Sequence, residues 1–271
     1  MARPLLVTGA SGYVGRALVA HLRHRGDDVC AWTGREGGPD VRDEAAVRAC
    51  VHDLRPRMVL HLVAAQADAA AQDLHATNVA GARHVALASA RIGARLVHLS
   101  SDMVHDGTAA PYGDDAPARP VTPYGRSKAA GEEAVLAAHP EALVVRTSLV
   151  IDPREPDRAT QGFLQRARAG DTVTLFSDEV RSAVDRSGFV RALVDLAATS
   201  ARGRLNVAGP VPCTRQALGE AFLRQALGPH GLRSVRVCTR AEAGVPERPA
   251  DLTLDSTRAY ALLGRPLPAP L

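Results

Sequence analysis

The sequence is poor in aromatic residues and has no long apolar run. Aromatic side chains make up 3% of the 271 residues, which argues against the base-stacking surfaces that bind single-stranded nucleic acid. The net charge is +4, but arginines and acids are interleaved along the chain without a block of one sign. Such a pattern is typical of solvated surfaces. With no run of 18 apolar residues, the sequence predicts neither a membrane nor a nucleic-acid partner.

The four cysteines are too scattered to form a disulfide framework or a thiolate metal site. Cys30, Cys50, Cys213 and Cys238 form no Cys-x-x-Cys pair, so we expect free thiols in a reducing compartment. The chain begins Met-Ala-Arg-Pro and enters a predicted strand at once, with nothing resembling a signal peptide before it. We therefore expect a cytoplasmic protein and predict no metal site.

Lysine is almost absent. Lys128 is the only lysine among 33 lysines and arginines, and Tyr124, one of four tyrosines, precedes it by four residues. On a helix these two side chains share a face. An ammonium beside a phenol favours the phenolate and lowers its pKa from roughly 10. The pair predicts a tyrosine that exchanges a proton near neutral pH; the alternative is a helix surface that carries both residues by chance.

A glycine-rich turn near the start of the chain predicts a dinucleotide site. A strand at residues 5–8 leads into Gly9-Ala-Ser-Gly-Tyr-Val-Gly15, and an amphipathic helix follows to about residue 25. Gly9 permits the turn, Gly12 lets the backbone approach a phosphate, and Gly15 lets the helix pack against the strand. The cofactor contacts expected here are Gly9, Ser11, Gly12, Tyr13, Val14 and Gly15. An ordinary strand–helix turn is the alternative.

The end of the second predicted strand, residues 28–33, bears on the choice of cofactor. In dinucleotide-binding folds an acid about 20 residues beyond the glycines binds the ribose 2′-hydroxyl, whereas an arginine suits a 2′-phosphate. Arg35 lies 20 residues after Gly15, with Glu36 beside it. The sequence therefore favours NADP(H), with NAD(H) possible; the alternative is a solvated loop arginine.

Strands and helices alternate through the rest of the first half. Predicted helices cover 44–54 and 70–92, predicted strands cover 58–63, 95–99 and 142–147, and Thr122-Pro123 is typical of a helix start. Asn78 is unfavourable in mid-helix. We expect it to hydrogen-bond toward the site, with a solvent-facing asparagine as the alternative. The loop at 103–122 is long enough to predict a functional role.

After residue 150 the alternation loosens. Helices are predicted at 161–169, 189–199, 214–227 and 255–263, and strands at 172–176, 204–207 and 234–238. The pattern predicts an α/β protein with a Rossmann-type doubly wound parallel sheet. The dinucleotide-binding domain is expected at 1–150 with contributions from 187–209. A smaller mixed α/β substrate lobe is expected at 151–186 and 210–271.

The glycine turn, a serine after the fourth strand and the Tyr-x-x-x-Lys pair together resemble the extended short-chain dehydrogenase/reductases. More narrowly, the chain is similar to the dTDP-4-dehydrorhamnose reductase-like sugar-nucleotide reductases. The stretches that carry this likeness are Ser100-Ser-Asp-Met-Val-His-Asp-Gly107, Pro111-Tyr-Gly-Asp-Asp115, Pro123-Tyr-Gly-Arg-Ser-Lys128 and Arg146-Thr-Ser-Leu-Val150. The family has an aromatic residue in place of Met103 and a tryptophan in place of Leu149.

The resemblance implies a role for each site residue. Ser101 would polarise a substrate carbonyl, Tyr124 would donate the proton, and Lys128 would lower the tyrosine pKa and hold the nicotinamide ribose. Asp40 and Val41 would contact the adenine, and Ala64 and Ala65 would lie on the nicotinamide side. The remaining assignments are a cofactor contact at Asn78 and substrate contacts at Asp102, Met103, Leu149 and Arg248.

The resulting hypothesis is an NADP(H)-dependent reductase of a keto group on a nucleotide-activated deoxysugar. A nucleotide-sugar epimerase or dehydratase is an alternative, disfavoured because no Asp-Glu pair follows Ser101. A second alternative is a cofactor-binding partner protein without catalysis, as in the regulatory subunit of methionine adenosyltransferase. The sequence leaves the sugar, the nucleotide and a homodimer open.

Overall fold

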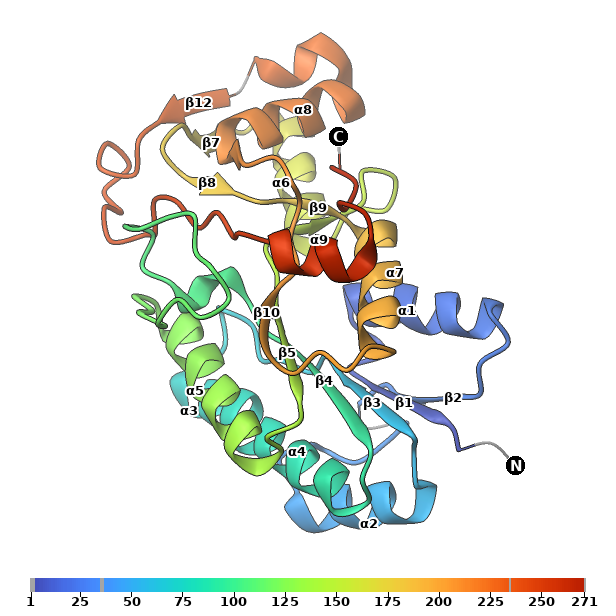
Figure 1. Ribbon diagram of the computed structural model, residues 1–271. Helices are drawn as coiled ribbons and strands as arrows, with labels where there is room; N and C mark the ends of the chain where they lie inside the picture. The colour runs from blue at the N-terminus through green and yellow to red at the C-terminus, as the bar shows by residue number, and fades with distance from the viewer. Residues whose placement is uncertain (1–2, 35–36, 234, 271) are drawn as a thin grey trace.

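The computed structural model describes residues 3–34, 37–233 and 235–270, and a six-stranded parallel sheet forms its centre. The strands lie in the order β10-β5-β4-β3-β1-β2. Their bounds are β1 (Leu5–Thr8), β2 (Val29–Trp32), β3 (Met58–His61), β4 (Arg95–Leu99), β5 (Leu143–Arg146) and β10 (Gly203–Asn206). Helices cover both faces (Figure 1), so the predicted doubly wound sheet is confirmed.

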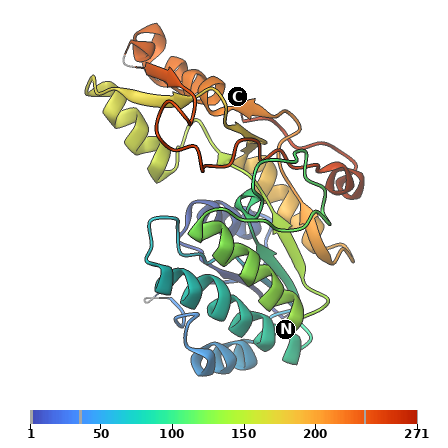
Figure 2. The same ribbon diagram turned by 90° about the vertical axis from the view of Figure 1, so that its left-hand side faces the viewer.

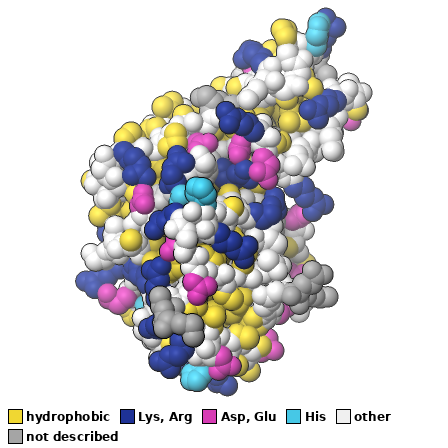
Figure 3. All heavy atoms as spheres, turned by 90° about the vertical axis from the view of Figure 1, so that its right-hand side faces the viewer, with side chains coloured by type: hydrophobic (Ala, Val, Ile, Leu, Met, Phe, Trp, Pro, Cys, Tyr) yellow, Lys and Arg dark blue, Asp and Glu magenta, His cyan; other side chains and the backbone are white. Residues whose placement is uncertain are grey.

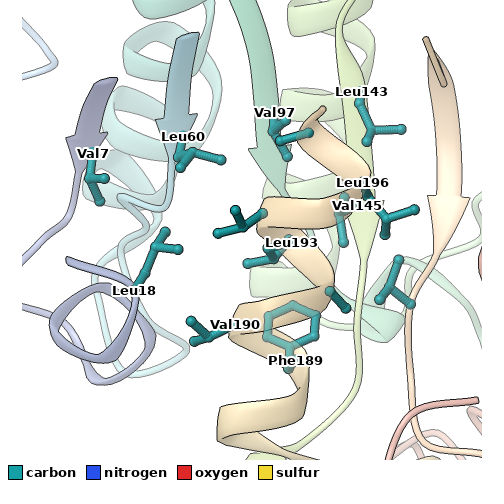
Figure 4. Packing of buried hydrophobic residues seen from close by; sticks show 14 of the residues in the cluster. Val7, Leu18, Leu60, Val97, Leu143, Val145, Phe189, Val190, Leu193 and Leu196 are labelled. Carbon is teal, nitrogen blue, oxygen red and sulfur yellow. The ribbon is translucent and has the colours of Figure 1, made fainter. Parts of the chain in front are cut away.

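One face of the sheet packs against α1 (Tyr13–His24), α7 (Arg186–Ala197) and α9 (Thr257–Leu263). Side chains alternate along a strand, so Val7, Leu60 and Val97 point to this face together. Phe189 and Leu193 of α7 meet them in a continuous apolar layer (Figure 4).

The opposite face packs against α2 (Glu44–Leu54), α4 (Ala82–Arg91) and α5 (Pro123–Ala138). Leu6, Val59 and Leu96, the alternate residues of the same strands, are buried there. A sheet covered on both faces requires strands that are apolar at nearly every position. This requirement explains why the sequence pattern located the central strands well.

The strand order reverses at β1. Its neighbours are β2 and β3, and the connections through α1 and α2 lie on opposite faces of the sheet. In open α/β sheets the crevice at such a reversal, beyond the carboxyl ends of the strands, is where ligands bind. The Gly9–Gly15 turn follows β1 directly and therefore lies at this crevice.

The long helix predicted at 70–92 is not regular. It consists of α3 (Ala71–His75), a π-helical segment η1 (Ala76–Gly81) and α4. A Cβ on Gly131 of α5 would overlap the carbonyl oxygen of Asn78, so this segment and α5 are in close contact. Such π-helical turns often occur at functional sites, and a hydrophobic pattern that repeats at helical spacing does not reveal them.

Two stretches of the later part of the chain, residues 158–176 and residues 215–238 apart from 234, lie beyond the carboxyl ends of the sheet strands (Figures 1 and 2). Their own core joins Leu164, Val173, Leu175 and Leu223. The elements are α6 (Arg158–Arg168), β7 (Val173–Phe176), α8 (Arg215–Leu227), η3 (Gly228–Leu232) and β12 (Val235–Cys238). Four strands of two residues were not predicted: β6 (Val150–Ile151), β8 (Val180–Arg181), β9 (Val184–Asp185) and β11 (Cys213–Thr214).

The face of the molecule shown in Figure 3 has no broad patch of a single charge sign. Arginine side chains lie among acidic ones over that whole face. Across the described ranges, no helix has the length and hydrophobicity that a membrane span requires. In the same part of the chain, no three His, Cys, Asp or Glu side chains come together as a metal-ligand group.

Candidate active site

A cavity of about 620 Å³ lies where the sheet strands end. The glycine turn lines one side of it, the end of β4 and the start of α5 line the middle, and the later elements line the far side. Of the residues predicted for the site, those lining the cavity are Gly9, Gly12, Tyr13, Val14, Gly15, Ala64, Ser101, Asp102, Met103, Tyr124, Lys128, Leu149 and Arg248.

The glycine turn has the geometry of an anion cradle. Gly9 adopts φ +72°, and a Cβ there would lie 2.8 Å from the backbone nitrogen of Val63. A Cβ on Gly15 would overlap the carbonyl oxygen of Gly9. Gly12 is the N-cap of α1, and no side chain caps the first turn, which leaves the helix N-terminus open toward the cavity. Ser11 is exposed on the same turn, and its carbonyl oxygen accepts a hydrogen bond from Arg16.

The Gly15→Ala variant should bind NADPH at least about tenfold more weakly, because the added methyl group displaces α1 from the turn. A fluorescence titration with NADPH measures the change. Gly162 of α6 is the matched control, since a Cβ there meets no atom within 4 Å. Unchanged affinity in Gly15→Ala would contradict the assignment of the turn to the cofactor.

Helix α5 carries Tyr124 and Lys128 to the end of β4. Thr122 caps the helix by accepting a hydrogen bond from the Gly125 backbone nitrogen, and Pro123 fills the first turn. A Cβ on Gly125 would overlap the carbonyl oxygen of Met103, so this glycine lets α5 lie close to the Ser101 segment. Both Tyr124 and Lys128 line the cavity with Ser101, as expected from their shared helix face.

Lys128 is almost completely buried. Its side chain is 2% exposed and its Nζ donates a hydrogen bond to the carbonyl oxygen of Leu99 at 2.8 Å. Burial lowers the pKa of Lys128 to about 8, although the Glu132 carboxylate one turn along α5 acts in the opposite direction. The only lysine of the chain is therefore a buried ammonium that can lose its proton near neutral pH.

The pKa of Tyr124 corrects a prediction. Burial, followed by the charge of Asp102, raises the pKa of Tyr124 to about 12 against the opposing effect of a hydrogen bond with Ser101. Lys128 makes no lowering contribution, so the expectation that the ammonium lowers this pKa is wrong for the described structure. The phenol therefore keeps its proton at neutral pH and has a proton to donate.

Ser101 and Asp102 begin the short 3₁₀ helix η2 (Asp102–Val104). The Ser101 hydroxyl accepts a hydrogen bond from the Met103 backbone nitrogen at 3.2 Å and donates to Asp102 at 3.1 Å. Asp102 is buried and also accepts a hydrogen bond from Ser148 at 2.6 Å. Burial raises the pKa of Asp102, while the Arg181 guanidinium and these hydrogen bonds lower it. Ser148, a cavity residue, was not singled out from the sequence.

Asn78 faces the protein interior, so the solvent-facing alternative is wrong. Its side chain is 1% exposed. The amide oxygen accepts a hydrogen bond from the Ala65 backbone nitrogen, and the amide nitrogen donates to the Ala65 carbonyl oxygen and to the Ser127 hydroxyl. Asn78 therefore ties the Ala64-Ala65 segment to α5 and acts as a positioning residue. Ala65, like Asn78, does not line the cavity.

The predicted adenine contacts lie away from this cavity. Val41 is buried between α2 and α4, where its side chain approaches Gly81. Asp40 is exposed and forms an ion pair with Arg42 at 2.6 Å. Neither lines the cavity. Arg35, on which the preference for NADP(H) depends, lies outside the described residues.

Both apolar and charged side chains line the far side of the cavity. Met103 packs beside Tyr112, and Leu149 packs beside Leu218. Arg248 pairs with the Glu179 carboxylate and lies over the Phe176 ring, 5.2 Å from its centroid. Sequence reasoning missed the other cavity residues of this side, which include Phe163, Phe176, Phe222, Glu179, Arg181 and Arg215.

A buried ion pair fixes α5, the helix that carries Tyr124 and Lys128, to β5. Arg146 and Glu132 are each 1% exposed, and Arg146 Nη2 donates to Glu132 Oε2 at 2.8 Å. Glu132 also accepts hydrogen bonds from Ser100 at 2.6 Å and from Arg204 at 3.0 Å. The pair joins α5 to β5 and to the residue before Ser101.

The pKa of Lys128 predicts how activity depends on pH. Because kcat/KM reports ionisations of the free enzyme, it should fall as the pH rises through about 8, where the ammonium loses its proton. The pKa of Tyr124, about 12, should contribute no loss in that range. A pH profile of kcat/KM for keto-sugar reduction checks this. A profile that is flat between pH about 7 and about 9 would show that the charge of Lys128 is not required.

The RmlD substrate binding domain family matches residues 3–269 of the chain. The chain belongs to this family. The dTDP-4-dehydrorhamnose reductase of Mycobacterium tuberculosis is 32% identical over 268 residues, which cover 96% of this chain and 87% of that protein. The dTDP-4-keto-6-deoxy-D-glucose reductase of Streptomyces niveus is 41% identical over 149 residues, which cover 53% of this chain and 51% of that protein.

A solved structure with the fold of this RmlD-family chain is that of Bacillus anthracis dTDP-4-dehydrorhamnose reductase in complex with NADP. It superposes with a TM-score of 0.87, covers 99% of this chain and 96% of its own, and is 24% identical. This likeness confirms the Rossmann-type architecture. The predicted resemblance to the dTDP-4-dehydrorhamnose reductase-like proteins is likewise confirmed by the family and its relatives.

Proposed function

We propose that this protein is an NADP(H)-dependent reductase of a keto group on a nucleotide-activated deoxysugar. The observation that carries the proposal is the convergence of Ser101, Tyr124 and Lys128 on one cavity, opposite the glycine cradle. The M. tuberculosis and S. niveus relatives are named as reductases of dTDP-linked keto sugars, which supports the same substrate class here.

The glycine turn fits a dinucleotide. Gly9 and Gly15 hold the backbone where a Cβ would fill the cradle, and the uncapped start of α1 suits a pyrophosphate. When bound, NADP(H) supplies a hydride from C4 of its nicotinamide ring. In the proposal, Lys128 holds the nicotinamide ribose and the Ala64-Ala65 segment lies along the nicotinamide side, fixed there by Asn78. Asp40 and Val41 remain the proposed adenine contacts.

Residues of the chain itself polarise the carbonyl group and supply the proton. On substrate binding the Ser101 hydroxyl would turn its one proton from Asp102 to the substrate carbonyl oxygen and polarise it. The Tyr124 hydroxyl would donate its proton to that oxygen as the carbonyl becomes a carbinol. The raised pKa of Tyr124 guarantees that the proton is present at neutral pH. Asp102, hydrogen-bonded to Ser101 and Ser148, orients the serine hydroxyl.

The proposal divides the chain as the sequence predicts. Residues 1–150, with 187–209, hold the cofactor, and residues 151–186 and 210–271 hold the substrate. Met103 and Leu149 would contact the sugar, and Arg248 would contact the nucleotide. A cytoplasmic setting accompanies this proposal, since all four cysteines are unpaired. A homodimer is compatible with it.

The test is consumption of NADPH with a panel of 4-keto nucleotide sugars, followed through the absorbance of the reduced nicotinamide. Turnover with at least one sugar is expected. NADPH binding without turnover of any sugar would favour the partner-protein alternative, and redox-neutral conversion would favour an epimerase or dehydratase.

The Arg35→Asp variant tests the choice between the two cofactors. It should lose affinity for NADPH by about tenfold or more while its affinity for NADH changes little, because an arginine suits the 2′-phosphate that only NADPH carries. Titrations with both cofactors measure this. Wild-type protein that binds NADH as tightly as NADPH would contradict the assignment.

A further inference from the structure

Arg215, the first residue of α8, lines the far side of the cavity. Within the described part of the chain, no hydrogen bond or ion pair engages its guanidinium. Its backbone is held, since the Arg215 backbone nitrogen donates to the Glu179 carbonyl oxygen at 2.7 Å. The structure thus fixes the residue while leaving its guanidinium available to the cavity.

The carboxylate that acts most strongly on this guanidinium is already engaged by two other arginines, so the positive charge of Arg215 is not balanced by it. Glu179, the buried carboxylate of the group, pairs with Arg248 and lies 3.8 Å from Arg181. Arg181 also approaches Asp102 at 3.9 Å. Burial lowers the pKa of Arg215, and the charges of Arg181 and Arg248 lower it further, against the opposing charge of Glu179.

The remaining acid near Arg215 is already engaged. Asp157, which contributes least to the pKa of Arg215, caps α6 by accepting a hydrogen bond from the Thr160 backbone nitrogen. An arginine with a purely structural role would satisfy its five donors within the protein. A desolvated guanidinium beside like charges is instead suited to an anion that arrives with the ligand.

The aromatic residues that line the same cavity as Arg215 indicate what else that ligand carries. Three of the four phenylalanines of the chain, Phe163, Phe176 and Phe222, line the cavity. In a protein with 3% aromatic residues this is a strong concentration, and aromatic faces suit a nucleobase. An anion next to an aromatic wall matches a nucleoside diphosphate.

We infer that Arg215 binds the diphosphate of the substrate and thereby sets the protein's preference for nucleotide-linked over free sugars. The inference rests on the proposed reductase function, because it assigns a subsite of the same cavity. Arg181 and Arg248 each form an ion pair with a carboxylate and define the shape of this subsite. Arg215 supplies the positive charge that these carboxylates do not balance.

Calorimetric titration of NADP⁺-saturated protein with dTDP, UDP, GDP and the matching nucleosides tests the inference. Saturation keeps the diphosphates out of the cofactor site. The wild type should bind at least one diphosphate more tightly than its nucleoside. In Arg215→Gln the Kd for that diphosphate should rise about 10- to 100-fold, since hydrogen bonds to charged groups are lost. The Kd for the nucleoside should be unchanged, and Arg215→Lys should recover part of the loss.

Arg224→Gln is the matched control, because Arg224 lies on the same helix but pairs with Glu220 on the exposed side. It should bind diphosphates as the wild type does. Diphosphate affinity that is equal in Arg215→Gln and wild type, or a wild type that binds none of the three diphosphates, would overturn the inference. These titrations involve no turnover. A wild type that binds diphosphates through Arg215 but reduces no keto sugar would therefore contradict only the reductase.

Discussion

The Tyr124→Phe variant should lose about 10²- to 10⁴-fold in kcat, which corresponds to roughly 3–5 kcal/mol of activation free energy. The substitution keeps the buried ring and removes only the hydroxyl that donates the proton. Because the Tyr124 hydroxyl is hydrogen-bonded to Ser101 within the cavity, its removal should leave thermal stability and NADPH affinity close to those of the wild type. Steady-state kinetics with a keto-sugar substrate, together with an NADPH titration, measure both.

The matched control is Tyr260→Phe, which removes a hydroxyl that donates to the Ala208 carbonyl oxygen outside the cavity. That variant should keep its kcat. If Tyr124→Phe retained most of the wild-type kcat, another group would have to supply the proton. Loss of NADPH binding in Tyr124→Phe would show instead that the residue acts on the cofactor.

The Arg146→Met variant should be destabilised by about 3–5 kcal/mol, because Glu132 would remain in the interior without its main partner. Arg204 and Ser100 still contact Glu132, which favours the lower end of this range. Urea unfolding measures the free energy. The double variant Arg146→Met, Glu132→Leu should recover much of the loss, since replacing a whole buried pair costs far less than breaking it.

The exposed pair between Arg202 and Glu141 is the control, and Arg202→Met should cost far less than Arg146→Met. Equal losses in the two variants would contradict the importance of the buried pair. The sign of the pH effect follows from the Arg146 guanidinium, whose hydrogen bond and charge hold the pKa of Glu132 below its ordinary value against the effect of burial. This contribution is present above the ordinary glutamate pKa of about 4.3 and is lost as the pH falls through the lowered value. The free energy of unfolding of Arg146→Met should therefore fall less than that of the wild type when the pH is lowered through this range.

Sequence periodicity located the regular elements closely. The helix at 44–54 and the strand at 95–99 were predicted with the bounds that the structure has. Both carry local signals, since Asp43 caps α2, and Leu96 and Val97 are apolar residues at buried positions of β4. Thr122-Pro123 likewise marked the start of α5. The two-residue strands β6, β8, β9 and β11 escaped because their pairing depends on distant partners.

Only part of the candidate site could be predicted, because some of its residues are brought together only by contacts between distant parts of the chain. Tyr124 and Lys128 are close in sequence, and their shared helix face follows from spacing alone. The pKa of Tyr124 could not be predicted from spacing, since it depends on burial and on Asp102. Arg215 could not be predicted as a cavity residue, because only the tertiary fold brings α8 beside Arg181 and Arg248.

Hydride transfer itself is tested most directly with NADPH that carries deuterium in the transferred position at C4 of the nicotinamide. The protein is incubated with a 4-keto nucleotide sugar, and the product is analysed by mass spectrometry. The account predicts one deuterium on the former carbonyl carbon for each NADPH oxidised, with the same transfer greatly slowed in Tyr124→Phe. A converted sugar without deuterium, or bound NADPH that is never oxidised with any of the keto sugars, would contradict it.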